Sequence, residues 1–164
     1  MITFKTSLGD ITIKLHEAEA PETCANFKQY VTDGHFDGTL FHRVIPGFMI
    51  QGGGFASGMQ QKPTRDPIKN EADNGLKNVR GSLSMARTSD PHSATSQFFL
   101  NVVDNAFLDF TAPNPNGWGY AVFAEVVDGM DVADKIVGVP TGSVGHHGDV
   151  PLEEVIIEQA TLAD

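Results

Sequence analysis

Apolar and polar side chains alternate in two short stretches near the start of the chain. Residues 2–5 alternate Ile and Phe with Thr and Lys, and residues 11–15 alternate Ile and Leu with Thr and Lys. Alternation with a period of two is typical of a β-strand that buries one face. Gly9-Asp10 lies between the two stretches and favours a tight turn. The pattern therefore predicts an N-terminal β-hairpin.

A helical pattern follows over residues 20–32. Its apolar side chains fall on one helical stripe, formed by Ala20, Cys24, Phe27 and Val31. Pro21 suits the first turn of a helix, and Gly34 suits its end. We expect this stripe to cover one end of the structure that the strands form. Within it, Cys24 is predicted to be a small buried side chain rather than a nucleophile.

The rest of the chain contains mostly short apolar runs. Strands are predicted over residues 83–86, 98–103, 120–127 and 155–162, and a second helix over residues 131–137. Loops are predicted over residues 52–80, 110–119 and 138–151. Many short strands with two helical patterns indicate an all-β sandwich or barrel, and the pattern alone does not choose between them. Without a repeat or a linker, residues 1–164 are expected to form one domain.

Residues 41–54 place a cation and an amide among large apolar side chains. Met49 and Gln51 share a face if this arm is a strand. In the preceding arm, Phe41 and Arg43 would likewise share a face. A Pro-Gly dipeptide between the arms favours a turn. The resulting apolar patch, with a guanidinium and an amide at its edge, suits a proline ring and the peptide bond before it.

Two other motifs point to no ligand. Gly52-Gly53-Gly54 is followed by Phe55 rather than by the Gly-Lys-Ser/Thr of a phosphate-binding loop, so we expect close backbone approach or unusual dihedral angles there. His146-His147 has no evident third ligand, and adjacent side chains seldom point the same way, so no metal site is predicted. No cofactor is expected either.

Four segments occur in a characteristic order and spacing, namely residues 41–54, 81–87 (Gly-Ser-Leu-Ser-Met-Ala-Arg), 93–100 (Ser-Ala-Thr-Ser-Gln-Phe-Phe-Leu) and 122–130. Together they resemble the cyclophilins, a family of peptidyl-prolyl cis-trans isomerases, over nearly the whole chain. The resemblance implies a closed eight-stranded antiparallel β-barrel capped by two α-helices. It also implies a packed interior and a binding groove on the outer wall.

The resemblance implies catalysis at Arg43 and Gln51. A guanidinium is always charged and offers several N–H donors to a twisted amide, and Gln51 is expected to accept from Arg43 and donate to the substrate carbonyl. The proline pocket is expected to be walled by Phe48, Met49, Phe99 and Leu108. The resemblance assigns backbone contacts with substrate to Ala86 and Arg87, and a groove glutamine to Gln97.

Two positions depart from many eukaryotic members of the family. Phe107 stands where they have Trp, and Tyr120 stands where they have His, whereas bacterial members resemble this chain at both. Phe107 lacks the indole N–H that contacts cyclosporin in the family. We therefore expect both residues to line the groove, activity to persist, and cyclosporin to bind weakly.

Charge and composition limit the binding partners and the cellular compartment that we expect for this chain. The chain has 21 acidic and 11 basic residues, a net charge of −10 with neutral histidines, which disfavours nucleic acid as a partner. A single cysteine excludes an intramolecular disulfide, and neither a secretory signal nor an apolar run of membrane-spanning length is evident. A cytoplasmic monomer that acts on proline-containing polypeptides and partly folded proteins is expected.

Two alternatives belong to other classes of protein. The first is a peptide-binding or chaperone module that recognises proline with little turnover, which loss of the arginine would favour. The second is a small hydrolase that uses Asp90, His92 and Ser93, which lie close together in one loop. Neighbours in a loop rarely form a catalytic triad, so the isomerase interpretation is preferred.

Overall fold

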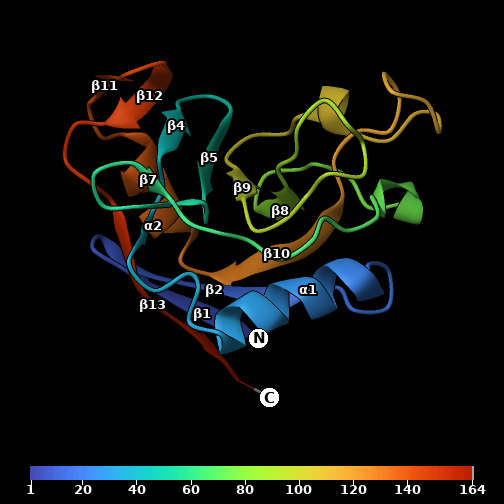
Figure 1. Ribbon diagram of the computed structural model, residues 1–164, viewed down its shortest axis with the longest axis horizontal. Coiled ribbons are helices and arrows are strands. Elements are labelled where there is room, and N and C mark those ends of the chain that lie inside the picture. Colours follow the sequence, from blue (N-terminus) through green and yellow to red (C-terminus); the bar gives the residue numbers. More distant parts are fainter. Residues whose placement is uncertain (164) are drawn as a thin grey trace.

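The computed structural model describes residues 1–163, which fold mainly into antiparallel β-structure with two α-helices (Figure 1). In chain order the elements are β1 (Ile2–Thr6), β2 (Gly9–Leu15), α1 (Pro21–Thr32), β3 (Thr39–Leu40), β4 (Arg43–Ile45), β5 (Met49–Gly52), β6 (Phe55–Ala56), β7 (Gln60–Gln61), the 3₁₀-helix η1 (Ala72–Asn74), β8 (Ser82–Met85), β9 (Phe98–Asn101), the 3₁₀-helix η2 (Ala106–Leu108), β10 (Val122–Asp128), α2 (Met130–Val137), β11 (Thr141–Val144), β12 (His147–Pro151) and β13 (Ile156–Leu162).

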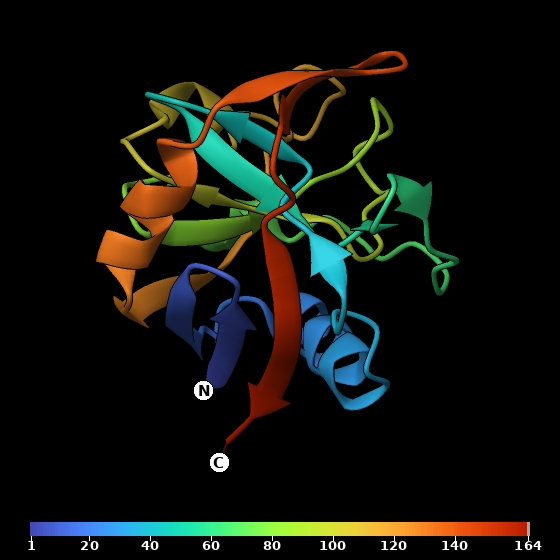
Figure 2. The ribbon, with the colours of Figure 1, turned by 90° about the vertical axis from the view of Figure 1, so that its left-hand side faces the viewer.

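Over the described residues, eleven strands form one curled sheet in the order β4-β5-β9-β8-β10-β2-β1-β13-β3-β6-β7, and β11 pairs with β12 in a separate hairpin. Every pairing in the large sheet is antiparallel. Figures 1 and 2 show α1 and α2 on different sides of the curled sheet. The prediction of a mainly antiparallel β-fold with two helices is therefore confirmed for this part of the chain.

The predicted N-terminal elements are present. β1 and β2 form the expected hairpin, and Gly9 takes a positive φ of 136° at its turn. α1 begins at Pro21, and the chain leaves the helix through Gly34 at a φ of 74°, a conformation that glycine adopts without strain. α2 matches the second predicted helix and is followed by Gly138.

The prediction of a loop over residues 138–151 is wrong, because β11 and β12 pair there. Gly142 lies opposite Val150, and Val144 lies opposite His147. Most side chains of this hairpin are exposed or half-buried, so it lacks the alternation of apolar and polar residues that signals a strand. Backbone pairing rather than burial of one face defines these two strands.

Aromatic rings fill the interior of the curled sheet. The ring of Phe27, from α1, lies 4.8 Å from the rings of Phe36 and Phe123, and Phe4 stacks on Phe98 at 5.4 Å. None of these five side chains is more than 1% exposed. The predicted apolar stripe of α1 therefore covers the core as expected.

Cys24 belongs to the same stripe. Its side chain is 1% exposed, and its thiol donates a hydrogen bond to the carbonyl oxygen of Phe123 at 3.4 Å. Burial, followed by the nearby carboxylate of Glu17, raises the pKa of this thiol to about 12. A thiol that stays protonated is a poor nucleophile. The predicted structural role of Cys24 is confirmed.

The expectation that Phe41 and Arg43 share a face is wrong. Phe41 is 1% exposed and packs edge-on against Phe98 in the core, whereas Arg43 is exposed. Phe41 and His42 lie between β3 and β4 and belong to neither strand. The alternation of faces therefore changes phase at this break, which turns Arg43 outward and Val44 into the core.

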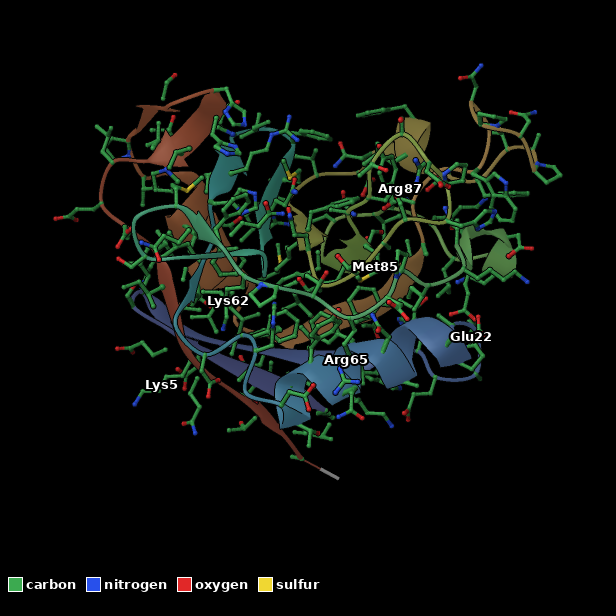
Figure 3. All side chains as sticks on the ribbon, in the orientation of Figure 1. Lys5, Glu22, Lys62, Arg65, Met85 and Arg87 are labelled. Carbon is green, nitrogen blue, oxygen red and sulfur yellow. The ribbon has the colours of Figure 1, made fainter. Side chains whose placement is uncertain are left out.

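Charged side chains lie on the outside of the molecule. Lys5, Glu22 and Arg65 are exposed, and Figure 3 shows Lys5 projecting away from the ribbon. The guanidinium of Arg65 donates two hydrogen bonds to Asp33 Oδ2, from Nε at 2.9 Å and from Nη2 at 2.5 Å. Neither α-helix in residues 1–163 has the length and apolar character needed to cross a membrane.

A buried layer of amides supports the outer face of β8 and β9. Asn101 Nδ2 donates to Asn78 Oδ1 at 3.1 Å and to Ser82 Oγ at 3.0 Å. Asn105 Nδ2 donates to Asn101 Oδ1 at 2.8 Å and to the carbonyl oxygen of Phe48 at 3.0 Å. This layer links the turn between β4 and β5 to β8, β9 and the segment before η2.

We predict that Asn101→Ala lowers the free energy of unfolding by about 1–3 kcal/mol, because it strands buried partners of a fully buried amide. Urea denaturation monitored by circular dichroism measures this change. Asn116→Ala is the matched control, since Asn116 is exposed. Equal stability of the two variants would show that the amide layer does not hold this face together.

Candidate active site

The pairing of β4, β5 and β9 aligns side chains of different chemistry in rows. Arg43 lies opposite Gln51, and Gln51 lies opposite Phe99. In the neighbouring row, Met49 lies opposite Asn101. Residues opposite one another in an antiparallel pair point to the same side of the sheet. The register thus places the guanidinium, the amide and the aromatic ring side by side on the outer face.

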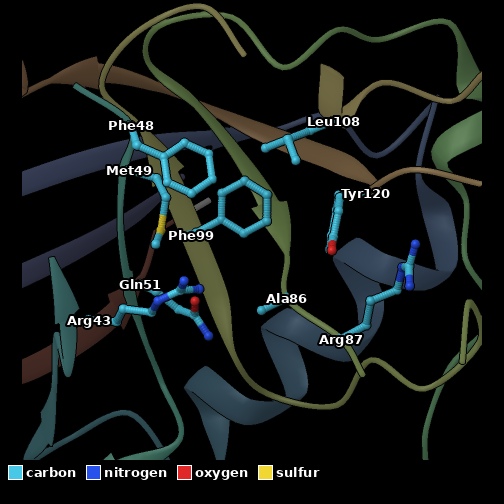
Figure 4. Close-up of a pocket in the computed structure, with 9 residues that line it drawn as sticks. All are labelled: Arg43, Phe48, Met49, Gln51, Ala86, Arg87, Phe99, Leu108 and Tyr120. Atoms are coloured by element: carbon cyan, nitrogen blue, oxygen red, sulfur yellow. The ribbon is translucent and has the colours of Figure 1, made fainter. Parts of the chain in front are cut away.

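These rows form one wall of a pocket with a volume of about 130 Å³ (Figure 4). Its lining consists of Arg43, Phe48, Met49, Gln51, Ala86, Arg87, Phe99, Leu108 and Tyr120. The pocket therefore brings together every predicted site residue except Gln97 and Phe107. It lies outside the packed aromatic core.

One end of the pocket is apolar. Met49, Phe99 and Leu108 are 2%, 5% and 9% exposed and form a small cluster separate from the core. Phe48 and Tyr120 pack against this cluster, and the ring of Tyr120 meets Phe99 edge-on at 5.6 Å. Figure 4 shows Phe48, Phe99 and Leu108 at this end. Such a surface accepts a compact apolar ring.

The other end of the pocket is polar. Gln51 Nε2 donates to Gln97 Oε1 at 2.9 Å, and the expected hydrogen bond from Arg43 to Gln51 is absent among the described residues. The guanidinium of Arg43 has no hydrogen bond or ion pair with any residue in 1–163. An exposed cation without a counter-charge remains available to a ligand.

Gln97 lies behind Gln51, beyond the lining of the pocket. It packs so closely on Gly54 that a Cβ there would lie 2.5 Å from Gln97 Cγ, and Gly53 has a positive φ of 93°. The expectation that these glycines allow close approach and unusual dihedral angles is confirmed. Gly54 leaves the space that Gln97 needs to hold Gln51.

Arg87 holds the loop that carries Tyr120. Its Nε and Nη2 donate to the carbonyl oxygen of Gly119 at 3.1 and 2.9 Å, and its guanidinium carbon lies 4.5 Å from the centre of the Tyr120 ring. Figure 4 shows this side chain on the far side of the pocket from Arg43. The side chain of Arg87 is therefore engaged with the protein, and its neighbour Ala86 donates its N–H to the carbonyl oxygen of Gln97 at 3.0 Å.

Phe107 lies on the rim rather than in the lining. Its side chain is 75% exposed and stacks on Phe48 with ring centres 5.7 Å apart and planes 26° apart. The 3₁₀-helix η2 points Leu108 into the pocket and Phe107 toward solvent. Phe107 is thus placed to touch a ligand that extends beyond the pocket.

The hydrolase alternative has no supporting geometry. His92 Nδ1 accepts the N–H of Asn70 at 3.1 Å, and Ser93 Oγ donates to the carbonyl oxygen of Asp90 at 2.6 Å. The His92 ring packs edge-on against Trp118 at 4.9 Å, a contact that holds the loops of His92 and Trp118 together. These hydrogen bonds stabilise the loop, and none of them joins Ser93 Oγ to the ring of His92, as a catalytic triad requires.

One residue beside the pocket was not singled out from the sequence. His42 is 5% exposed, and its Nδ1 is the one buried side-chain nitrogen or oxygen in residues 1–163 that has no hydrogen-bond partner. Burial, then the charges of His147 and Arg43, lower the pKa of His42 to about 4. The one sequence feature that could have identified His42 as a residue of the site is its position directly before Arg43.

Within residues 1–163, no group of three or more His, Cys, Asp or Glu residues could hold a metal ion.

Comparisons with known proteins agree with this geometry. Residues 1–162 match the family described as "Cyclophilin type peptidyl-prolyl cis-trans isomerase/CLD". The chain is 63% identical over 164 residues to peptidyl-prolyl cis-trans isomerase B of Escherichia coli strain K12, covering 100% of both chains. It is 60% identical to the isomerase cyp18 of Streptomyces antibioticus, covering 98% of this chain and 97% of the relative.

The fold is similar to that of a solved relative. A cyclophilin-type isomerase from Cryptosporidium parvum, crystallised in the presence of the dipeptide Ala-Pro, superposes with a TM-score of 0.79. The two sequences are 26% identical, and the alignment covers 99% of this chain and 98% of the other.

We predict that Arg87→Ala weakens binding of an Ala-Pro dipeptide about three- to tenfold. The substitution removes a cation–π contact of about 0.5–1 kcal/mol and charge-assisted hydrogen bonds that position Tyr120. Dipeptide titration followed by NMR measures the affinity. Arg65→Ala is the matched control, because that guanidinium pairs with Asp33 away from the pocket. Wild-type affinity in Arg87→Ala would refute this positioning role.

Proposed function

The chain belongs to the cyclophilin-type peptidyl-prolyl cis-trans isomerases, and we propose that the pocket beside Arg43 is its active site. As an enzyme of this family it catalyses rotation about the peptide bond before proline in peptides and proteins. The observation that carries the site assignment is the free guanidinium of Arg43 at the edge of an apolar pocket.

The reaction sets what the site must supply. The peptide bond resists rotation because of its partial double-bond character, with a barrier of about 18–20 kcal/mol. Exchange between the two forms before proline takes tens of seconds or longer without a catalyst. As the bond twists, the lone pair localises on the prolyl nitrogen, which becomes a better hydrogen-bond acceptor than in either ground state. A donor aimed at that nitrogen lowers the barrier.

We assign that donor to Arg43. A guanidinium stays charged and presents a rigid fork of N–H groups, so it pays no protonation cost as the lone pair develops. It makes no ion pair among the described residues, which leaves it available to substrate. The reaction then needs no nucleophile, proton transfer or cofactor.

We assign the second catalytic role to Gln51. Its amide has two N–H donors and one oxygen acceptor, and the hydrogen bond to Gln97 uses only one donor. The second N–H is then available to the substrate carbonyl oxygen, and the oxygen is available to the guanidinium once substrate is bound. In this proposal Gln97 orients Gln51.

The apolar end is proposed to hold the proline ring. Met49, Phe99 and Leu108 form its buried surface, and Phe48 and Tyr120 form its sides. The backbone of Ala86 and Arg87 contacts the substrate chain, and Phe107 on the rim contacts larger ligands such as cyclosporin. Binding energy gained on the ring keeps the twisting bond beside the guanidinium.

We also propose that residues 1–164 form one domain and that the curled sheet closes into an eight-stranded barrel; Asp164 lies outside the described residues. β3 and β4 are consecutive in the chain and separated by two residues, and they lie at opposite ends of a nine-strand run in the sheet, which becomes eight strands if β3 and β4 count as one interrupted strand. The N–H of Phe41, between them, donates to Val155 at 3.0 Å. A cytoplasmic monomer that assists folding of partly folded proteins fits the composition.

Arg43→Ala is expected to lower kcat/KM for an Ala-Pro peptide by about 10²–10³, the scale for loss of one preorganised donor. Arg43→Lys should recover little, because an ammonium does not reproduce the fork. NMR exchange spectroscopy without a coupled protease measures the rate. Since Arg43 is exposed, both variants should keep the thermal stability of the wild type. Near-wild-type exchange would instead favour a binding module whose arginine has no catalytic role.

Phe107→Trp is expected to tighten cyclosporin binding about ten- to a hundredfold. The indole adds a hydrogen bond of about 0.5–1.5 kcal/mol and a similar amount from extra apolar area at about 25 cal/mol per Å². Because Phe107 lies on the rim, Ala-Pro exchange should stay within a few-fold. Inhibitor titration monitored by exchange tests both expectations, and unchanged inhibition would contradict a role for this position.

A further inference from the structure

A second pocket adjoins the proposed active site on the side away from Tyr120. Its volume is about 430 Å³, and it shares Arg43 and Gln51 with the proline pocket. We name it the histidine pocket after His42, His146 and His147, which line it. A polypeptide leaving the proline pocket past Arg43 therefore meets these three imidazoles.

The histidine pocket is built by the β11–β12 hairpin, which lies against β4 (Figure 1). The rings of His146 and His147 lie 4.2 Å apart. The ring of Phe55 contacts both His147 and His42, with ring centres 5.2 Å and 4.5 Å apart respectively. A buried aromatic ring thus fixes His42 and His147 relative to each other.

His42 presents a donor to this space. Its Nδ1 is buried without a partner, whereas its Nε2 is not among the buried unpaired atoms of residues 1–163 and so retains accessible surface. A proton on Nδ1 would be a buried N–H with no acceptor, which is rare in proteins. The ring therefore carries its proton on Nε2, where it can be donated to a ligand.

The polar lining is rich in donors and poor in carboxylates. The titratable and charged groups that face the pocket are His42, Arg43, His146, His147 and Asp149. Asp149 is the one acid among them, in a molecule whose net charge is −10. Ligand oxygens with negative charge match this lining.

We propose that the histidine pocket is a specificity subsite for an acidic side chain of the substrate polypeptide that flanks the Xaa-Pro bond. The inference rests on the proposed active site, since the two pockets share Arg43. An Asp or Glu side chain accepts from His42 Nε2 and from the imidazoles of His146 and His147. It contributes to substrate binding and takes no part in the rotation itself.

The overall charge of the molecule predicts the opposite preference. A net charge of −10 repels acidic peptides, so without a local subsite a Glu peptide binds more weakly than its Gln counterpart. At about 0.15 M salt the screening length is about 8 Å, which suppresses the distant charges and leaves the contact charges. The sign of the Glu-to-Gln difference therefore separates the two effects.

The experiment uses hexapeptides with one Ala-Pro bond and Glu or Gln at each other position in turn. NMR exchange on the full chain at 0.15 M salt gives KM and kcat. At one or more positions the Glu peptide should have about a three- to tenfold lower KM at pH 6, with unchanged kcat. Equal or higher KM at every position would overturn the proposal. A lower kcat without a lower KM would also overturn it, since the acid would then be pairing with Arg43.

Variants test the assignment of the subsite. His146→Gln with His147→Gln should bring the Gln-to-Glu KM ratio close to one, whereas Asp149→Asn should increase it. Asn tolerates the positive φ of 60° at position 149, so the Asp149→Asn variant should keep the fold of the β11–β12 hairpin. The control is His16→Gln, which lies outside the pocket lining. A ratio above one that survives the double substitution would contradict the proposal.

The outcome is independent of the proposed mechanism. Exchange of the neutral Gln peptides reports the active site alone and should be the same in the wild type and in the His16→Gln control. If Arg43→Ala leaves neutral exchange intact, the mechanism fails whatever the Glu preference. If neutral exchange behaves as expected and the Glu preference is absent, only the subsite fails.

Discussion

The register between β4, β5 and β9 is the constraint on which the site depends. It sets Arg43 opposite Gln51 and Gln51 opposite Phe99, so that a cation, an amide and an aromatic ring share one face. A shift of one residue in β5 would turn Gln51 and Met49 into the core and expose Ile50, which is fully buried. Burial of Ile50 and Val44 therefore fixes the position of the proposed catalytic groups on the opposite face.

The outer face must also be rigid, because a donor stabilises a transition state only if it is already in place. Two sets of contacts, one buried and one half-buried, serve this purpose. The amide layer around Asn101 joins the turn carrying Phe48 to β9, and Arg87 fastens Tyr120 through the carbonyl oxygen of Gly119. The apolar surface that we propose for proline lies outside the packed aromatic interior and is formed by Met49, Phe99 and Leu108.

Much of this arrangement could be predicted from the sequence, because a strand or helix that buries one face repeats its apolar residues with a characteristic spacing. The alternation at residues 2–5 and the stripe through Cys24 and Phe27 predicted β1 and α1. The motif in residues 41–54 identified the pocket. The β11–β12 hairpin could not be predicted, because its exposed strands carry no alternation. Nor could the phase change between Phe41 and Arg43, which depends on tertiary contacts on both sides of His42.

The central claim is that a fixed charge, without proton transfer, accelerates the rotation. The groups nearest the site agree with it, since the lowered pKa of about 4 keeps His42 neutral above pH 6. The most direct measurement is the enzyme-catalysed exchange rate of a neutral Ala-Pro peptide in H₂O and in D₂O between pH 6 and 8. We predict a nearly flat profile and similar rates in the two solvents. A bell-shaped profile with a substantially slower rate in D₂O would contradict the account.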